Sequence, residues 1–181
     1  MVEIDSSHNS LLRPSPHLGE VGLTVDAGPE VDTLVAPISL EFAWGAVPVE
    51  LSVAPIAWHH VTLARRPVHS SFVTDGRPLT PLPGVVSKIG TTSYGLRLYL
   101  DVDLRPFADA FSLAAPQTPY VTVAYAVRPI GSKSAQAALL DWCEGSTFIL
   151  DSIEHRRSGG GRFPWRFDVI NRWVCASLNS A

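Results

Sequence analysis

The fold is decided by residues 96–105, which read LRLYLDVDLR. Five apolar residues occupy every second position of this stretch, and the positions between them are charged or aromatic. Successive side chains of a β-strand point to opposite faces, so this alternation predicts a half-buried antiparallel strand and fits a helix badly. One face of the strand is therefore expected to meet a core and the other to meet water.

Several further segments predict strands in the same way. They either alternate between apolar and polar residues or are rich in β-branched and aromatic residues. These segments are residues 38–44, 49–54, 58–63, 120–128, 147–154 and 163–176. We expect an all-β fold, an antiparallel β-sandwich or a jelly-roll-like barrel of about seven or eight strands.

Two short helices and one long loop are expected between these strands. Residues 105–114 begin with Pro106, which suits a first helical turn. Residues 134–144 place apolar residues three and four apart and stop at Gly145, a suitable left-handed cap. Residues 74–93 contain three prolines and three glycines and are predicted to form a long ordered loop.

Charge is distributed unevenly along the chain. Eight acidic residues and only Arg13 occur in residues 1–56, whereas bases outnumber acids in the remainder. Residues 1–36 are also interrupted by proline and glycine, so we predict an extended acidic N-terminal arm followed by a β-sandwich domain over residues 37–181. An acidic arm is the opposite of the basic arm with which a protein binds nucleic acid.

Composition excludes several classes of protein. Apolar runs are too short for a membrane-spanning helix, and the acidic start is unlike a secretory signal. The two cysteines, Cys143 and Cys175, lie in no zinc-binding pattern. Buried free thiols are the favoured interpretation, with one disulfide between them as the alternative.

The candidates for catalysis have simpler structural explanations. His59 and His60 are adjacent on a predicted strand and point to opposite faces, so they cannot chelate one metal ion together; His69 is a conceivable third ligand. Asp101 and Asp103 share a face with arginines, which predicts salt bridges. The glycine-rich residues 158–161 lead into a predicted strand, which indicates a hairpin and not a phosphate loop. We therefore expect no enzyme activity, cofactor or metal.

Residues 58–63, WHHVTL, resemble a short strand of laminin-G-like sugar-binding sandwiches. The likeness covers six residues of 181, and the flanking glycine and aspartate pattern of that family is missing. The resemblance implies a carbohydrate-binding or adhesive module, which would need exposed tryptophans on one sheet face.

The C-terminal hairpin combines arginines with aromatic residues. Because this mixture is typical of protein–protein contacts, we predict an interface there. Its residues are Arg156, Arg157, Arg162, Trp165, Arg166, Arg172 and Trp173. The alternatives are a plain core with solvated arginines, in which Trp165, Phe167 and Val169 share the core face, and weak nucleic-acid contact across residues 156–172.

Fold and composition together favour a self-assembling structural protein. We expect a virion component, a capsid, shell or tail subunit assembled in the host cytoplasm. Its contacts with copies of itself or with other subunits would use the N-terminal arm and the C-terminal hairpin, and a partner's arm would cover an open sheet edge. The runner-up functions are the carbohydrate-binding module and, third, an enzyme whose site is assembled from scattered residues.

Overall fold

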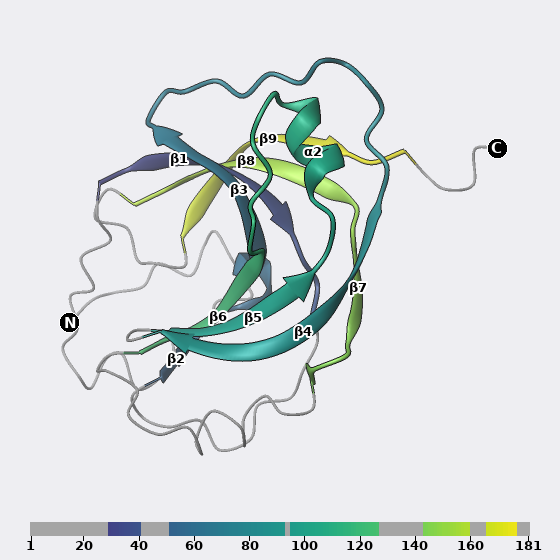
Figure 1. The fold of residues 1–181 in the computed structure, drawn as a ribbon. Helices are drawn as coiled ribbons and strands as arrows, with labels where there is room; N and C mark the ends of the chain where they lie inside the picture. The colour runs from purple at the N-terminus through teal and green to yellow at the C-terminus, as the bar shows by residue number, and fades with distance from the viewer. Residues whose placement is uncertain (1–28, 41–50, 93–94, 127–142, 160–165, 177–181) are drawn as a thin grey trace.

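The computed structural model describes residues 29–40, 51–92, 95–126, 143–159 and 166–176. In this part of the chain nine strands form two antiparallel sheets that face each other as a sandwich (Figure 1). The expected all-β antiparallel sandwich is therefore confirmed. No helix within the described ranges is long and apolar enough to cross a membrane.

The first sheet, sheet A, has four strands in the order β3-β1-β8-β9. Their bounds are Val31–Pro37 for β1, His60–Pro67 for β3, Ser152–Ser158 for β8 and Phe167–Val174 for β9. Sheet A contains the hairpin β8–β9, as expected from the glycine-rich residues between its strands. The strand β9 lies at one end of the sheet.

The second sheet, sheet B, has five strands in the order β2-β6-β5-β4-β7. Their bounds are Leu51–Val53 for β2, Leu82–Thr92 for β4, Gly95–Asp101 for β5, Tyr120–Ala126 for β6 and Thr147–Leu150 for β7. Within it β4, β5 and β6 follow one another along the chain, as in an antiparallel meander.

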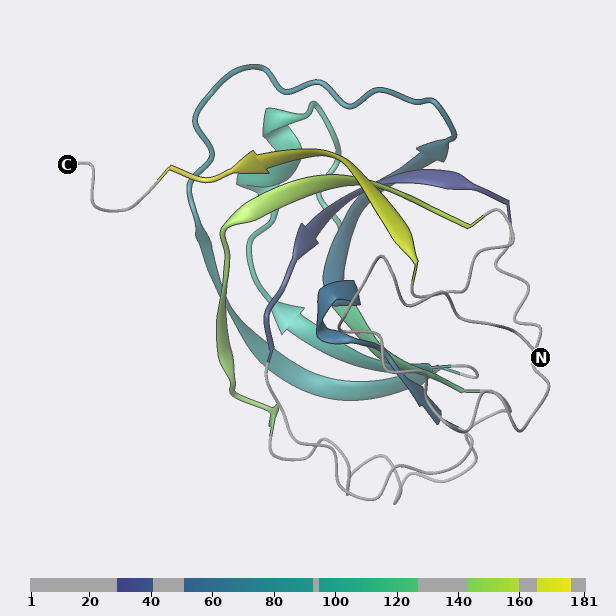
Figure 2. The ribbon, with the colours of Figure 1, turned by 180° about the vertical axis from the view of Figure 1, so that it is seen from behind.

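The chain crosses from sheet B to sheet A at Asp151. Residues 147–154, expected as one strand, are divided there into β7, which pairs with β4, and β8, which pairs with β1 (Figure 2). A strand that changes sheets at a bend forms a closed corner of a sandwich. This corner brings the start of β8 beside β7, and the site described below lies there.

The core lies between the two sheets. The alternation that predicted β5 is confirmed, because Leu96, Leu98 and Leu100 are buried against the core residues Leu34 and Ile153 of sheet A. Each fully buried leucine stabilises the fold by about 1.5–3 kcal/mol. The same core also contains Val61, Val86, Phe107, Val121, Val123, Phe148 and Leu150.

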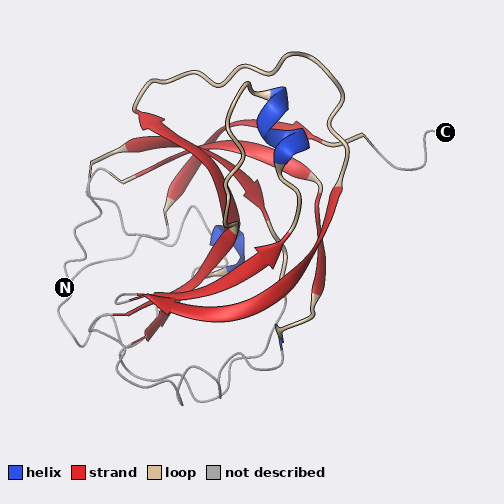
Figure 3. Cartoon of the chain, viewed as in Figure 1, coloured by secondary structure: helices blue, strands red, loops and turns tan. Residues whose placement is uncertain are grey.

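Among the described residues, two short helical segments accompany the sheets (Figure 3). The helix α2, Arg105–Ala110, begins as expected with a proline in its first turn and buries Phe107 in the core. The 3-10 turn η2, Ile56–Trp58, replaces the first residue of the strand expected at 58–63, so that β3 begins at His60. The helix expected at 134–144 lies outside the described residues, apart from its last two positions.

The loop expected over residues 74–93 is wrong for its second half, which forms the eleven-residue strand β4. Its glycines are strand residues with aromatic rings packed over them. A Cβ atom on Gly84 would lie 2.4 Å from Phe148 Cζ, and one on Gly90 would lie 2.3 Å from Tyr99 Cε2. The glycines thus make room for rings from the neighbouring strands, which the local sequence does not reveal.

The boundary of the predicted N-terminal arm also changes. Residues 31–36, assigned to the arm, belong to β1, which lies between β3 and β8 in sheet A. Residues 1–28 lie outside the described part of the chain, as do residues 41–44 of the strand expected at 38–44; residues 38–40 are not in a strand.

Candidate functional site

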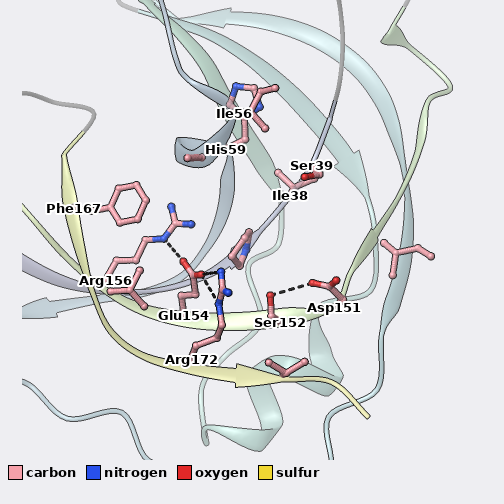
Figure 4. Close-up of a pocket in the computed structure, with 15 residues that line it drawn as sticks. Ile38, Ser39, Ile56, His59, Asp151, Ser152, Glu154, Arg156, Phe167 and Arg172 are labelled. Carbon is pink, nitrogen blue, oxygen red and sulfur yellow. Dashed lines mark hydrogen bonds and ion pairs between the residues drawn. The ribbon is translucent and has the colours of Figure 1, made fainter. Parts of the chain in front are cut away.

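A groove of about 720 Å³ lies on the side of sheet A that faces away from the core (Figure 4). Its floor consists of β8 and β9, and its walls come from the end of β1, from η2 and from β7. The charged residues Glu154, Arg156 and Arg172 lie in the floor. Apolar residues surround them at the rim: Ile56, Ile149, Phe167, Val169 and Val174.

One carboxylate in the floor is shared by two arginines. Arg156 Nε donates to Glu154 Oε2 at 2.6 Å, and Arg172 Nε donates to Glu154 Oε1 at 2.7 Å. Glu154 is 1% exposed and Arg156 is 4% exposed, whereas the Arg172 side chain is 57% exposed. Both oxygens of the carboxylate are therefore neutralised by charged donors, and the three groups together carry one positive charge.

Aromatic side chains hold Arg156 from the other side. Its guanidinium lies 4.0 Å from the centre of the Phe167 ring, and Arg156 Nη1 lies 3.4 Å from His60 Nδ1. The Trp58 ring contacts both neighbours, with ring centres 5.6 Å from Phe167 and 5.4 Å from His60. Burial lowers the pKa of Arg156, and the charge of Glu154 opposes that change.

The two histidines beside the groove are held neutral at physiological pH. Burial lowers the pKa of His59 to about 4, although a hydrogen bond to the backbone of Ala54 acts in the opposite direction. Burial also lowers the pKa of His60 to about 3, and the positive charge of Arg156 adds to the effect. His69 lies apart, in an exposed turn after β3. No three His, Cys, Asp or Glu residues of the described ranges gather as a potential metal site.

The groove is suited to binding. Both carboxylate oxygens of Glu154 are engaged by guanidinium groups. The nearby Asp151 accepts a hydrogen bond from the Ser152 hydroxyl at 3.0 Å. A rigid, slightly positive floor with an apolar rim can receive an apolar side chain or an extended segment that carries an acidic group.

A second buried ion pair lies at the opposite end of the same strands. Asp32 is completely buried, and Arg157 donates to both of its carboxylate oxygens, at 2.8 and 3.2 Å. The backbone N–H of Ser70 donates to it at 3.0 Å, and His155 Nε2 lies at 3.5 Å. The hydrogen bonds from Arg157 hold the pKa of Asp32 below its ordinary value, against the effect of burial. This cluster ties β1, β8 and the turn after β3 together.

Asp32→Asn is expected to lower the free energy of unfolding by about 2 kcal/mol. The neutral side chain has one acceptor oxygen instead of two for the hydrogen bonds from Arg157 and from the Ser70 N–H. Chemical denaturation at neutral pH measures the change. Asp75→Asn is the matched control, because Asp75 forms an exposed pair with Arg77 that contributes little. Equal losses in the two variants would contradict the importance of the Asp32 cluster.

The structure places the predicted interface residues in different environments. Arg156, Arg157 and Arg172 are bound by carboxylates of this same chain. Trp173 is half-buried, with its ring centre 4.9 Å from that of Phe111. Arg166 is half-buried at the start of β9. Arg162 and Trp165 lie outside the described residues.

The expected core face of β9 is wrong at Phe167 and Val169. The pairing of β9 with β8 skips Ile170, so a β-bulge separates the two halves of the strand. A bulge reverses the faces of the residues that precede it, and these two side chains therefore line the groove with Arg172 and not the core with Trp173.

The sequence did not identify the groove residue Glu154 or the position of Trp58 beside the groove. Glu154 stands two positions before Arg156, a spacing that places both on one face of a strand, but the predicted strand ended at Glu154. A carbohydrate-binding module would need exposed tryptophans, whereas Trp58, the first residue of the segment 58–63, is half-buried against Phe167. The two cysteines, Cys143 and Cys175, are buried thiols that form no disulfide, as favoured.

Comparisons with known proteins add no family to this description. None of the protein-family models matches the chain, and no curated protein matches it significantly.

Proposed function

We propose that this protein is a self-assembling structural subunit, of the kind that builds a virion shell or tail, and that its copies meet along β9. The observation that carries the proposal is the apolar free edge of sheet A. Strand β9 pairs with β8 on one side and is the last strand of the sheet in the described part of the chain. The N–H and C=O groups of such an edge are available to another chain.

The edge carries side chains that favour association. Val169 and Ile170 are each 48% exposed, and Val174 is 70% exposed. Ile149 and Ile56 extend this apolar surface across the groove, since both are exposed and line it. Exposed β-branched residues on an edge strand make a monomer prone to aggregation, whereas in a subunit they can form the contact with a neighbouring copy.

Charge in the groove supports the same role. Arg172 is held by Glu154 but keeps more than half of its side chain exposed, so it is ordered before a partner binds. Arginine is enriched in protein interfaces, and an ordered side chain loses less entropy on binding. Of the residues predicted for the hairpin interface, the proposal therefore keeps Arg172 and adds the exposed apolar residues of β9.

The test is the oligomeric state of three proteins in light scattering coupled to size exclusion. The unmodified chain is expected to form assemblies much larger than its 19.6 kDa monomer at micromolar concentration. Ile170→Lys is expected to weaken association by at least about tenfold, because it buries a charge at the contact. Val73→Lys, in the exposed loop after β3, is the control and should assemble normally.

Circular dichroism should show that both variants keep the β fold, since each position is exposed. A monomeric unmodified protein would overturn the proposal as a whole. Assembly that resists Ile170→Lys would show that β9 is not the contact.

A further inference from the structure

The face of sheet B that is turned away from the core carries a row of aromatic and basic side chains. Lys88 of β4, Tyr99 of β5 and Tyr120 of β6 are direct cross-strand neighbours. Arg97 lies two positions before Tyr99 and so shares its face. We call these four residues the tyrosine row.

The four side chains contact one another in sequence across the sheet. Lys88 Nζ lies 4.9 Å from the centre of the Tyr99 ring, and the centres of the Tyr99 and Tyr120 rings are 6.3 Å apart. The Arg97 guanidinium lies 4.1 Å from the centre of the Tyr120 ring. Such cation–π and ring contacts fix side chains that would otherwise be mobile on a surface.

The tyrosine row faces solvent. Leu98, which lies between Arg97 and Tyr99, and Val121, which follows Tyr120, are fully buried in the core, and a strand alternates its faces. Tyr120 is 38% exposed, and Tyr125 on the same strand is 40% exposed. Tyr125 pairs with Gly95, which has no side chain, so the open face continues beyond the row.

The two cations of the row form no ion pair in the described part of the chain. Arg77, Arg105, Arg156, Arg157 and Arg172 each have a carboxylate partner, whereas Arg97 and Lys88 contact tyrosine rings. The sequence predicted salt bridges of Asp101 and Asp103 with the arginines of the same face, Arg97 and Arg105. The structure confirms only the salt bridge between Arg105 and Asp103.

Two acids lie near the row. Asp101 follows Tyr99 by two positions and is an exposed acid of this face. Glu144 accepts a hydrogen bond from the backbone N–H of Ile89, the neighbour of Lys88, at 3.1 Å. The two cations of the row contact tyrosine rings and not these carboxylates. Burial raises the pKa of Tyr125, and the charges of Arg65 and Arg97 act in the opposite direction.

We propose that the tyrosine row binds single-stranded nucleic acid. Tyrosine rings and the guanidinium plane of Arg97 can stack on unpaired bases, and Lys88 and Arg97 can contact the phosphates between them. A single strand is favoured over a duplex because bases within a duplex are already stacked and do not offer their faces to a flat sheet. This activity is independent of the assembly proposed above.

The proposal places nucleic-acid contact elsewhere than the alternative that the sequence left open. That alternative was weak contact across residues 156–172, where Arg156, Arg157 and Arg172 are paired with Glu154 and Asp32. Cations without carboxylate partners bind phosphate more readily, because no ion pair has to be broken first. For this reason we favour sheet B over sheet A.

The test is fluorescence anisotropy of a labelled oligouridylate of about 12 nucleotides, titrated with the full chain at low salt. Tyr120→Ala is expected to raise Kd by about 5- to 100-fold through the loss of one stacked base. Arg97→Gln should raise Kd and reduce the slope of log Kd against log salt by about 0.7. Arg105→Gln is the matched control and should bind as the unmodified chain does.

The outcomes separate this proposal from its alternatives. Binding that is equal for duplex and single strand and insensitive to Tyr120→Ala would overturn it in favour of non-specific attraction to a polyanion. Absence of binding at low salt would also overturn it. Because Arg97→Gln changes an outward-facing side chain, it keeps the test valid if the tyrosine variant is poorly folded. Ile170→Lys is expected to bind with unchanged affinity per subunit, so that loss of assembly and loss of binding are distinguishable.

Discussion

Glu154→Gln is expected to lower the free energy of unfolding by about 3–5 kcal/mol, the largest effect of any single substitution considered for this chain. The carboxylate is the counter-charge of Arg156, which is 4% exposed and cannot turn to water. A glutamine of the same shape removes that charge and leaves the guanidinium buried without a counter-ion. The loss of the carboxylate costs less at Arg172, because more than half of the Arg172 side chain is exposed to water.

Urea denaturation at neutral pH measures this change. Asp103→Asn is the matched control, since it removes a carboxylate from the exposed pair with Arg105 and should change the stability little. The double variant Glu154→Leu, Arg156→Met removes both buried charges and is expected to be more stable than Glu154→Gln alone. If Glu154→Gln were as mild as the control, the groove floor would not depend on a buried ion pair.

Acid is expected to destabilise the protein well above the pH at which carboxylates titrate. The folded-state pKa values of His59, about 4, and of His60, about 3, lie below the ordinary value of 6.5. Below pH 6.5 the unfolded chain therefore binds protons that the folded chain does not bind. The stability contributed by these neutral imidazoles is complete above pH 6.5 and is lost as pH falls toward the folded-state values.

The expected size of this effect is large. For His59 alone, the difference between 6.5 and about 4 corresponds to about 3 kcal/mol. The depressed pKa values of Asp32 and, at about 2, of Asp103 add a further loss only at lower pH. Unfolding free energies measured between about pH 7 and about pH 4.5 should fall by up to about 1.4 kcal/mol per pH unit for each histidine.

A non-titrating variant isolates the contribution of His59. His59→Gln is expected to reduce by one the number of protons that the chain takes up on unfolding in acid, whatever its effect on stability at neutral pH. His69→Asn is the control for loss of an exposed imidazole, and asparagine tolerates the positive φ of 65° at that turn. A pH profile that His59→Gln leaves unchanged would show that folding does not lower the pKa of this histidine.

Much of the fold follows from local patterns. Leu96, Leu98 and Leu100 alternate with polar residues, and the burial of one strand face is a property of two-residue spacing that needs no knowledge of the partner strand. In the same way Pro106 marked the start of α2. The burial of the two cysteines without a disulfide agreed with their apolar character.

Strand β4 could not be predicted by the same means. Gly84 and Gly90 were interpreted as loop residues because glycine usually interrupts strands. Their role is to accommodate Phe148, which is 64 positions further along the chain, and Tyr99 of the neighbouring strand. The reason for each glycine therefore lies in a ring that only the folded sheet brings near.

The candidate site, too, could be predicted only in part from the sequence. The residue types of the C-terminal hairpin indicated a contact surface, but the sequence did not say which arginines are occupied by carboxylates. Glu154 holds Arg172 across 18 positions, and Asp32 holds Arg157 across 125. In the sequence, an arginine with a carboxylate partner cannot be distinguished from one without such a partner, because the partner is known only once the strands are paired.

By itself, the sequence determined the class of this protein: a period of two in apolar residues commits a segment to a strand with one buried face, and enough such segments must pack as sheets. Tertiary structure alone decided which side chains meet. The bulge at Ile170 turned Phe167 and Val169 out of the core, and the corner at Asp151 brought β7 beside the groove. Strand register depends on neighbours distant in the chain, and a shift of one residue exchanges the faces of everything beyond it.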